Sequence, residues 1–182
     1  MDWPVTEPST HLYLVAEEVD RFQSQYQLCA HYDVETDWVA ADRKDVLADE
    51  GVYGGFASPV RGGYGVSIDV LLLDFDAERY LSAIEIIGKR STFVNADVSV
   101  PVTARKALMR LRDTPTRPDS LDVETEVDVY TNHERSVVCV NLPEFNQRSV
   151  WFAVGENCYV ALDQGRLTAV LFYLNNAPCS AT

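Results

Sequence analysis

Apolar runs interrupted by short acidic stretches recur along the chain and predict β-hairpins. The clearest is Leu71–Ile87, LLLDFDAERYLSAIEII, and a weaker counterpart is Tyr159–Leu174, YVALDQGRLTAVLFYL. Two apolar stretches joined by residues that tolerate tight backbone angles are typical of a hairpin. Gly165 supplies that tolerance in the second stretch, and Asp74, Asp76 and Arg79 stand in for it in the first.

Closely spaced apolar segments in the second half of the chain predict an antiparallel meander. The expected strands are Val127–Thr131, Ser136–Asn141, Ser149–Val154, Asn157–Leu162 and Leu167–Leu174.

Two segments show the spacing of an amphipathic helix. In Thr103–Asp113, Thr103 can cap a helix whose apolar stripe and basic face follow a period of 3.6 residues. In His11–Gln25 the spacing favours a helix, although its opening HLYLV suits a strand equally well. We therefore predict a β-rich α+β fold, in which two related antiparallel β units are separated by one clear helix at Thr103–Asp113.

The two halves of the chain show a weak internal similarity. Tyr32–Ala41 aligns with Tyr130–Cys139, and the later hairpins align if one turn residue is skipped. The aligned strand residues are Leu81, Ala83 and Ile84 with Leu167, Ala169 and Val170. Duplication and chance similarity between hairpins both remain open. The length predicts one compact domain, 1–182, which a duplication would divide into halves 11–113 and 119–177.

Acidic turn residues and apolar strand residues between Tyr32 and Ile86 follow a pattern that resembles a small bacterial domain family of unknown function. The pattern reads Tyr-Asp-x-Glu-x-Asp, an apolar strand, a loop, and then an apolar run with Asp-Phe-Asp. The matching residues are Tyr32, Asp33, Glu35, Asp37, Asp74, Phe75, Asp76, Leu81, Ile84, Glu85 and Ile86. The chain departs from the pattern at Arg79, Tyr80 and Ala83. Because these residues belong mainly to turns and strands, the resemblance implies a fold rather than an activity.

The formal charge of −13 disfavours direct binding to nucleic acid or to an anionic membrane. It fits a basic protein partner, mimicry of a polyanion, or simple solubility. The N-terminus lacks the pattern of a signal peptide, and no apolar run approaches the roughly 20 residues that span a bilayer, so we expect a cytoplasmic protein. The cysteines are scattered without metal-site spacing, which favours reduced thiols.

No catalytic or metal-binding constellation stands out in the sequence. Asp74-Phe75-Asp76 matches the strand-end acids of phosphate-transferring hydrolases only superficially, because those enzymes need a parallel sheet with helices between its strands. Asp33, Glu35 and Asp37 lack the glycine and distal glutamate of a calcium loop. We therefore expect no metal, no cofactor and, on balance, no enzymatic activity.

Two functional hypotheses of different classes follow. The first is an acidic binding protein that blocks a basic partner, such as an immunity protein against a bacterial toxin or an inhibitor of a nucleic-acid enzyme. Its expected contact residues are Asp74, Asp76, Glu78, Asp119, Asp122, Glu124, Glu126 and Asp128. The second is a small-molecule binder or enzyme with a pocket under the Gly/Tyr-rich loop 51–65. The pocket residues would be Tyr53, Phe56, Arg61 and Tyr64.

Overall fold

The computed structural model describes residues 9–43, 63–113 and 120–174, and in these ranges the chain is almost entirely β. Fifteen strands form two sheets, and the only helical elements described are two single 3-10 turns, η1 at Ser24–Tyr26 and η2 at Arg90–Thr92. The prediction of a β-rich chain is confirmed. The α+β class with a helix between two antiparallel units is wrong, and both sheets are mixed rather than purely antiparallel.

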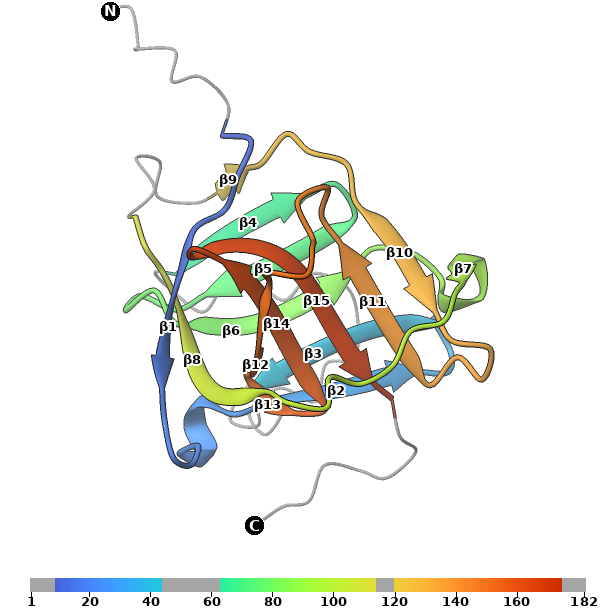
Figure 1. The fold of residues 1–182 in the computed structure, drawn as a ribbon, viewed down its shortest axis with the longest axis horizontal. Helices are drawn as coiled ribbons and strands as arrows, with labels where there is room; N and C mark the ends of the chain where they lie inside the picture. Colours follow the sequence, from blue (N-terminus) through green and yellow to red (C-terminus); the bar gives the residue numbers. More distant parts are fainter. Residues whose placement is uncertain (1–8, 44–62, 114–119, 175–182) are drawn as a thin grey trace, which may run out of the picture.

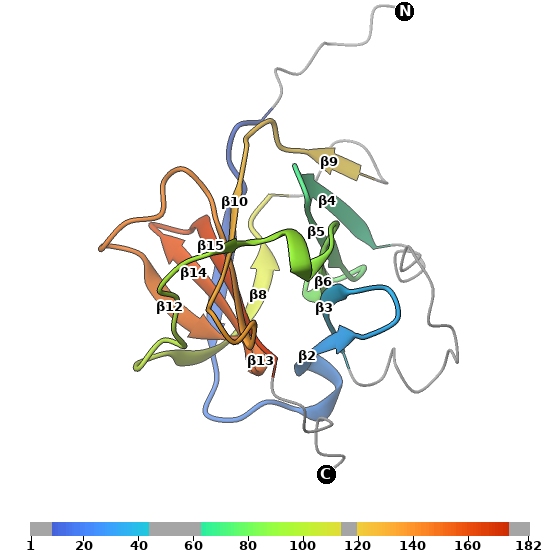
Figure 2. The ribbon, with the colours of Figure 1, turned by 90° about the vertical axis from the view of Figure 1, so that its right-hand side faces the viewer.

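Figures 1 and 2 show the sheets as two layers packed face to face. The eight-stranded sheet has the spatial order β1 (Leu14–Glu18), β8 (Arg105–Leu111), β12 (Val150–Ala153), β14 (Cys158–Asp163), β15 (Arg166–Tyr173), β11 (Val137–Asn141), β10 (Asp128–Thr131) and β7 (Val94–Asn95). The seven-stranded sheet has the order β13 (Gly155–Glu156), β2 (Leu28–Asp33), β3 (Trp38–Arg43), β6 (Leu81–Ile86), β5 (Leu71–Phe75), β4 (Tyr64–Ile68) and β9 (Ser120–Asp122).

The hydrophobic core lies between the two sheets and takes side chains from both. Phe75 and Ile84 from the seven-stranded sheet are fully buried together with Phe172 and Val170 from the eight-stranded sheet. A smaller apolar cluster covers the outer face of the eight-stranded sheet, where Val98 and Val100 pack against Leu171 and its neighbours. The outer face of the seven-stranded sheet instead carries charged side chains, which are described below.

The segment predicted as the central helix is strand β8. Ala107, Met109 and Leu111 are buried, whereas the residues between them are partly exposed, so exposure alternates with a period of two. The same residues also fit the apolar stripe of a helix. Pairing with β1 on one side and β12 on the other stabilises the strand instead. For His11–Gln25 the strand alternative holds, because this segment contains β1 and η1 and no α-helix.

Each sheet contains a five-strand unit, and the two units have the same topology. The order β2-β3-β6-β5-β4 in one sheet corresponds to β10-β11-β15-β14-β12 in the other, so each unit places its first, second, fifth, fourth and third strands side by side. Both units also shift register at the same place in their last hairpin, after the pairs Asp74–Ala83 and Ala161–Ala169. Whether a duplication produced the two units stays a prediction.

The pairing registers test the two sequence alignments separately. Ala83 and Ala169 occupy matching positions, in agreement with the alignment of the last hairpins. In the first hairpins, Tyr32 packs against the central core, whereas Tyr130 pairs with Cys139 of the outer apolar cluster. The alignment of these two tyrosines is therefore displaced by one residue, which moves a side chain to the opposite face of a sheet.

Of the residues that the sequence indicated for the two turns, Arg79 and Gly165 are left-handed, whereas Asp76 has no positive φ and Asp74 lies within β5. Gly165 has φ +81° in the turn between β14 and β15, and Arg79 has φ +73° in the turn between β5 and β6. Glycine adopts this conformation without strain, whereas arginine needs local support. That support comes from Asp76, which organises the β5–β6 turn.

Candidate functional site

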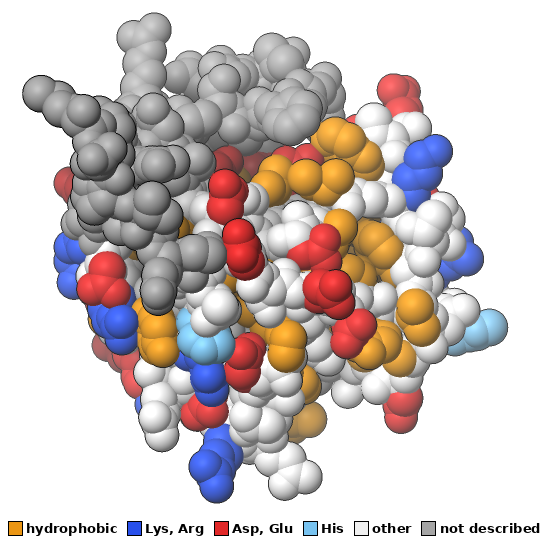
Figure 3. Space-filling view, turned by 90° about the horizontal axis from the view of Figure 1, so that it is seen from above, with side chains coloured by type: hydrophobic (Ala, Val, Ile, Leu, Met, Phe, Trp, Pro, Cys, Tyr) orange, Lys and Arg blue, Asp and Glu red, His pale blue; other side chains and the backbone are white. Residues whose placement is uncertain are grey.

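The acidic residues that lead from β9 into β10 form one exposed row. Exposure alternates along this segment, so that Asp122, Glu124, Glu126 and Asp128 are exposed while Val123 is buried between them. We call these four carboxylates the acidic ridge. It lies at the top of the molecule in Figure 1, and Figure 3, seen from above, shows carboxylate side chains in a band across that end.

The backbone of the acidic ridge is tied to neighbouring segments. The Val123 N–H donates to the Ser67 carbonyl at 2.9 Å, and the Glu124 N–H donates to the Ser9 carbonyl at 3.1 Å. The Val127 N–H donates to Asp69 Oδ2 at 3.2 Å. The ridge thus begins in β9, which pairs with β4 in one sheet, and ends in β10 of the other sheet, so its backbone is held by both sheets.

The structure does not gather the other predicted contact residues onto the ridge. Asp74 lies on the outer face of β5. Asp69, which accepts a hydrogen bond from the ridge segment, precedes β5, whereas Asp76 and Glu78 follow β5 in the β5–β6 turn at its other end. Asp119 lies outside the described residues. The expectation of a single acidic face is therefore corrected to a ridge of four residues plus separate acids at other places.

Asp76 has a structural role. Its Oδ1 accepts hydrogen bonds from the N–H groups of Glu78 at 3.0 Å and Tyr80 at 2.8 Å, which closes the β5–β6 turn. Its Oδ2 accepts from Arg43 Nη2 at 2.8 Å, and the Arg43 side chain is only 8% exposed. Arg43 also donates to the carbonyls of Leu81 and Tyr80. Asp76 is thus the partner of a buried arginine and stabilises the turn.

Three other carboxylates converge on the outer face of the seven-stranded sheet. Asp42 of β3 and Asp74 of β5 both pair with Ala83 of β6, and Glu85 lies two residues further along the same face of β6. His31 Nε2 is 3.5 Å from Asp42 Oδ2. Sequence reasoning missed this cluster because Asp42 and Glu85 look like ordinary strand residues, and only the strand register places them beside Asp74.

Burial and mutual repulsion perturb these carboxyl groups. Burial, followed by repulsion from Glu85 and Asp42, raises the pKa of Asp74 to about 6. Burial, followed by repulsion from Asp42, raises the pKa of Glu85. Burial also raises the pKa of Asp42, and the nearby His31 opposes this effect. The folded protein therefore holds protons on this face at a pH where free carboxyl groups have lost them.

We expect Asp74→Asn to stabilise the protein above pH 6 by about 1–2 kcal/mol, a figure reduced for solvent screening. Because the pKa of Asp74 is raised in the folded state from 3.8 to about 6, the folded state binds more protons, and stability falls as pH rises through that interval. The variant should show a smaller decrease in stability over this pH interval. Urea unfolding between pH 3.5 and 8 measures it, with Glu35→Gln in an exposed turn as the control. An unchanged pH slope for Asp74→Asn would refute the prediction.

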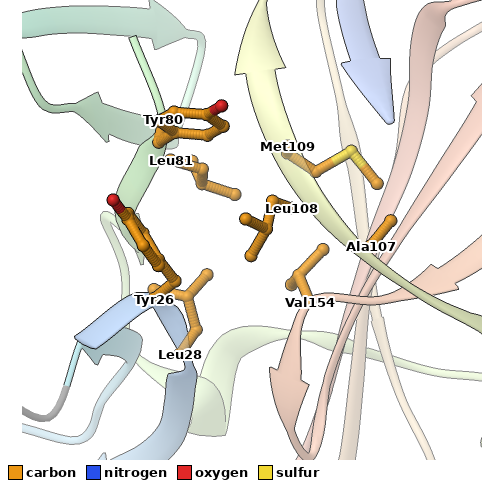
Figure 4. Close-up of a pocket in the computed structure, with 8 residues that line it drawn as sticks. All are labelled: Tyr26, Leu28, Tyr80, Leu81, Ala107, Leu108, Met109 and Val154. Atoms are coloured by element: carbon orange, nitrogen blue, oxygen red, sulfur yellow. The ribbon is translucent and has the colours of Figure 1, made fainter. Parts of the chain in front are cut away.

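The alternative pocket cannot be assembled from the described residues. Tyr53, Phe56 and Arg61 lie outside them, and Tyr64 of β4 packs against the central core. A different pocket opens between the sheets, where Figure 4 shows Tyr26, Leu28, Tyr80 and Leu81 facing Leu108, Met109 and Val154. Its empty space is about 210 Å³ and includes open solvent, which is small for an organic ligand.

The described residues contain no cluster of three or more histidine, cysteine or acidic side chains that could hold a metal ion. The acids of the Tyr-Asp-x-Glu-x-Asp pattern serve the β2–β3 turn instead. Asp33 accepts the Glu35 N–H at 2.8 Å, and Asp37 accepts hydrogen bonds from Tyr32 and Ser91. Although desolvation opposes them, these bonds lower the pKa of Asp37 to about 2.

The cysteines differ in state. Cys139 and Cys158 are free and buried, and burial raises the pKa of the Cys139 thiol to about 12. Such thiols are unreactive and pack as small apolar groups, as the sequence indicated. Cys29 is disulfide-bonded, which corrects the expectation of a reduced thiol at that position.

Neither a protein-family model nor a curated protein sequence matches the chain. In the three ranges that the structure describes, no helix is long and apolar enough to cross a membrane.

Proposed function

We propose that the protein is a non-enzymatic binding protein that uses the acidic ridge to block a basic surface on another protein. The observation that carries this proposal is that the ridge carboxylates have no cationic partner among the residues that the structure describes. Elsewhere many carboxylates pair with arginine, as Glu17 does with Arg110 and Glu18 with Arg105. Within the described residues, no lysine or arginine forms an ion pair with any of the four ridge carboxylates.

A row of uncompensated charges on a fixed backbone suits electrostatic recognition. The ridge lies on a protein of net charge −13, so a basic partner is attracted to the molecule as a whole and is then oriented by the ridge. Because the backbone hydrogen bonds already hold the segment, little ordering cost remains to be met on binding. Asp76 differs from the ridge carboxylates, because it pairs with the buried Arg43 and so serves the fold.

Two kinds of partner offer the required basic surface. A nucleic-acid enzyme has a positively charged groove that follows a phosphate backbone, and a row of carboxylates can occupy such a groove and exclude the substrate. A basic toxin can be blocked in the same way, in which case the protein acts as an immunity protein. The shared chemistry is the neutralisation of a basic groove by exposed carboxylates.

The test is the association kinetics of the partner, captured first from lysate of the source organism, with the triple variant Glu124→Lys, Glu126→Lys and Asp128→Lys. Asp122 is left unchanged because it accepts a hydrogen bond from the Ser67 hydroxyl. Electrostatic steering accelerates association by roughly 10- to 1,000-fold, so we expect the triple variant to lose at least about tenfold in association rate at low salt. The loss should shrink as salt shortens the screening length to about 8 Å.

A matched control reverses three exposed acids in turns away from the ridge, Glu35, Glu78 and Glu134. It changes the net charge by the same amount, so it measures the contribution of overall charge alone. We expect it to slow association much less than the ridge variant does. Equal effects of the two variants, or association that does not depend on salt, would mean that the ridge contributes only to solubility.

A further inference from the structure

We draw no further inference here: the strongest candidate, the carboxylate cluster of Asp42, Asp74 and Glu85 on the outer face of the seven-stranded sheet, is a group of acidic side chains with only His31 close by, and nothing in the described part of the chain shows what covers that face or points to a ligand.

Discussion

Replacing Asp76 with alanine should lower the free energy of unfolding by about 3–5 kcal/mol, because it leaves the buried guanidinium of Arg43 without its ion-pair partner. The N–H groups of Glu78 and Tyr80 would lose their acceptor in the β5–β6 turn as well. Urea unfolding followed by circular dichroism measures the change. Asp76→Asn keeps an acceptor for the turn and removes the charge, so the difference between the two variants separates these contributions.

Glu78→Ala is the matched control for Asp76→Ala, because Glu78 occupies the same turn and its side chain is exposed. We expect its effect to stay within about 0.5 kcal/mol. Arg43→Met and the double variant complete a mutant cycle, and the double variant should be less destabilised than the sum of the single ones. If Asp76→Ala lowers the free energy of unfolding no more than Glu78→Ala does, the ion pair does not stabilise the fold. Asp76 would then again be a candidate contact residue.

Replacing Gly155 with alanine should destabilise the protein by about 3 kcal/mol or more, since the added methyl group has no space. A Cβ atom at this position would lie 1.9 Å from the carbonyl oxygen of Leu28, and the other close atoms are also backbone atoms of Leu28. Gly155 belongs to β13, which pairs with β2 at the edge of the seven-stranded sheet. The change must therefore push β13 away from β2. The contact between the two halves of the chain at that edge would then be lost.

Gly165→Ala provides the comparison for Gly155→Ala. Gly165 has φ +81°, and a Cβ there would lie 3.2 Å from the Leu14 carbonyl oxygen, so the strain is mainly conformational. We expect this change to cost about 1–2 kcal/mol. Thermal unfolding of both variants and hydrogen exchange at Leu28 and Cys29 measure the difference. Similar stability of the two variants, with unchanged exchange in β2, would show that the approach of β13 to β2 is not tight.

The sequence allowed the hairpins and their turns to be predicted because their chemistry is local. The apolar strands on either side of Asp76 are β5 and β6, and the left-handed turn positions at Arg79 and Gly165 lie where the pattern placed them. A tight turn needs particular residues within a few positions of one another, and such requirements are visible in any short window of sequence.

The helix prediction at Thr103–Asp113 was wrong because the apolar residues of this segment fit both the 3.6-residue period of a helix and the two-residue period of a strand. Ala107 and Leu111 share a helical face, and Ala107, Met109 and Leu111 share a strand face. Local preference is a weak determinant when a segment can pair on both sides, and β8 has the partners β1 and β12. The sequence of the segment itself does not indicate these pairing partners.

For the acidic residues, the sequence by itself determined the total charge and the alternation of acids along the ridge, because both are properties of consecutive positions. Only the tertiary structure decided the role of each acid. It joined Asp76 to Arg43, which precedes it by 33 residues, and placed Asp42 and Glu85 beside Asp74 through strand register. Register and pairing partners depend on how distant apolar faces fill one core, and for this reason the buried ion pair and the outer-face cluster could not be read from the sequence alone.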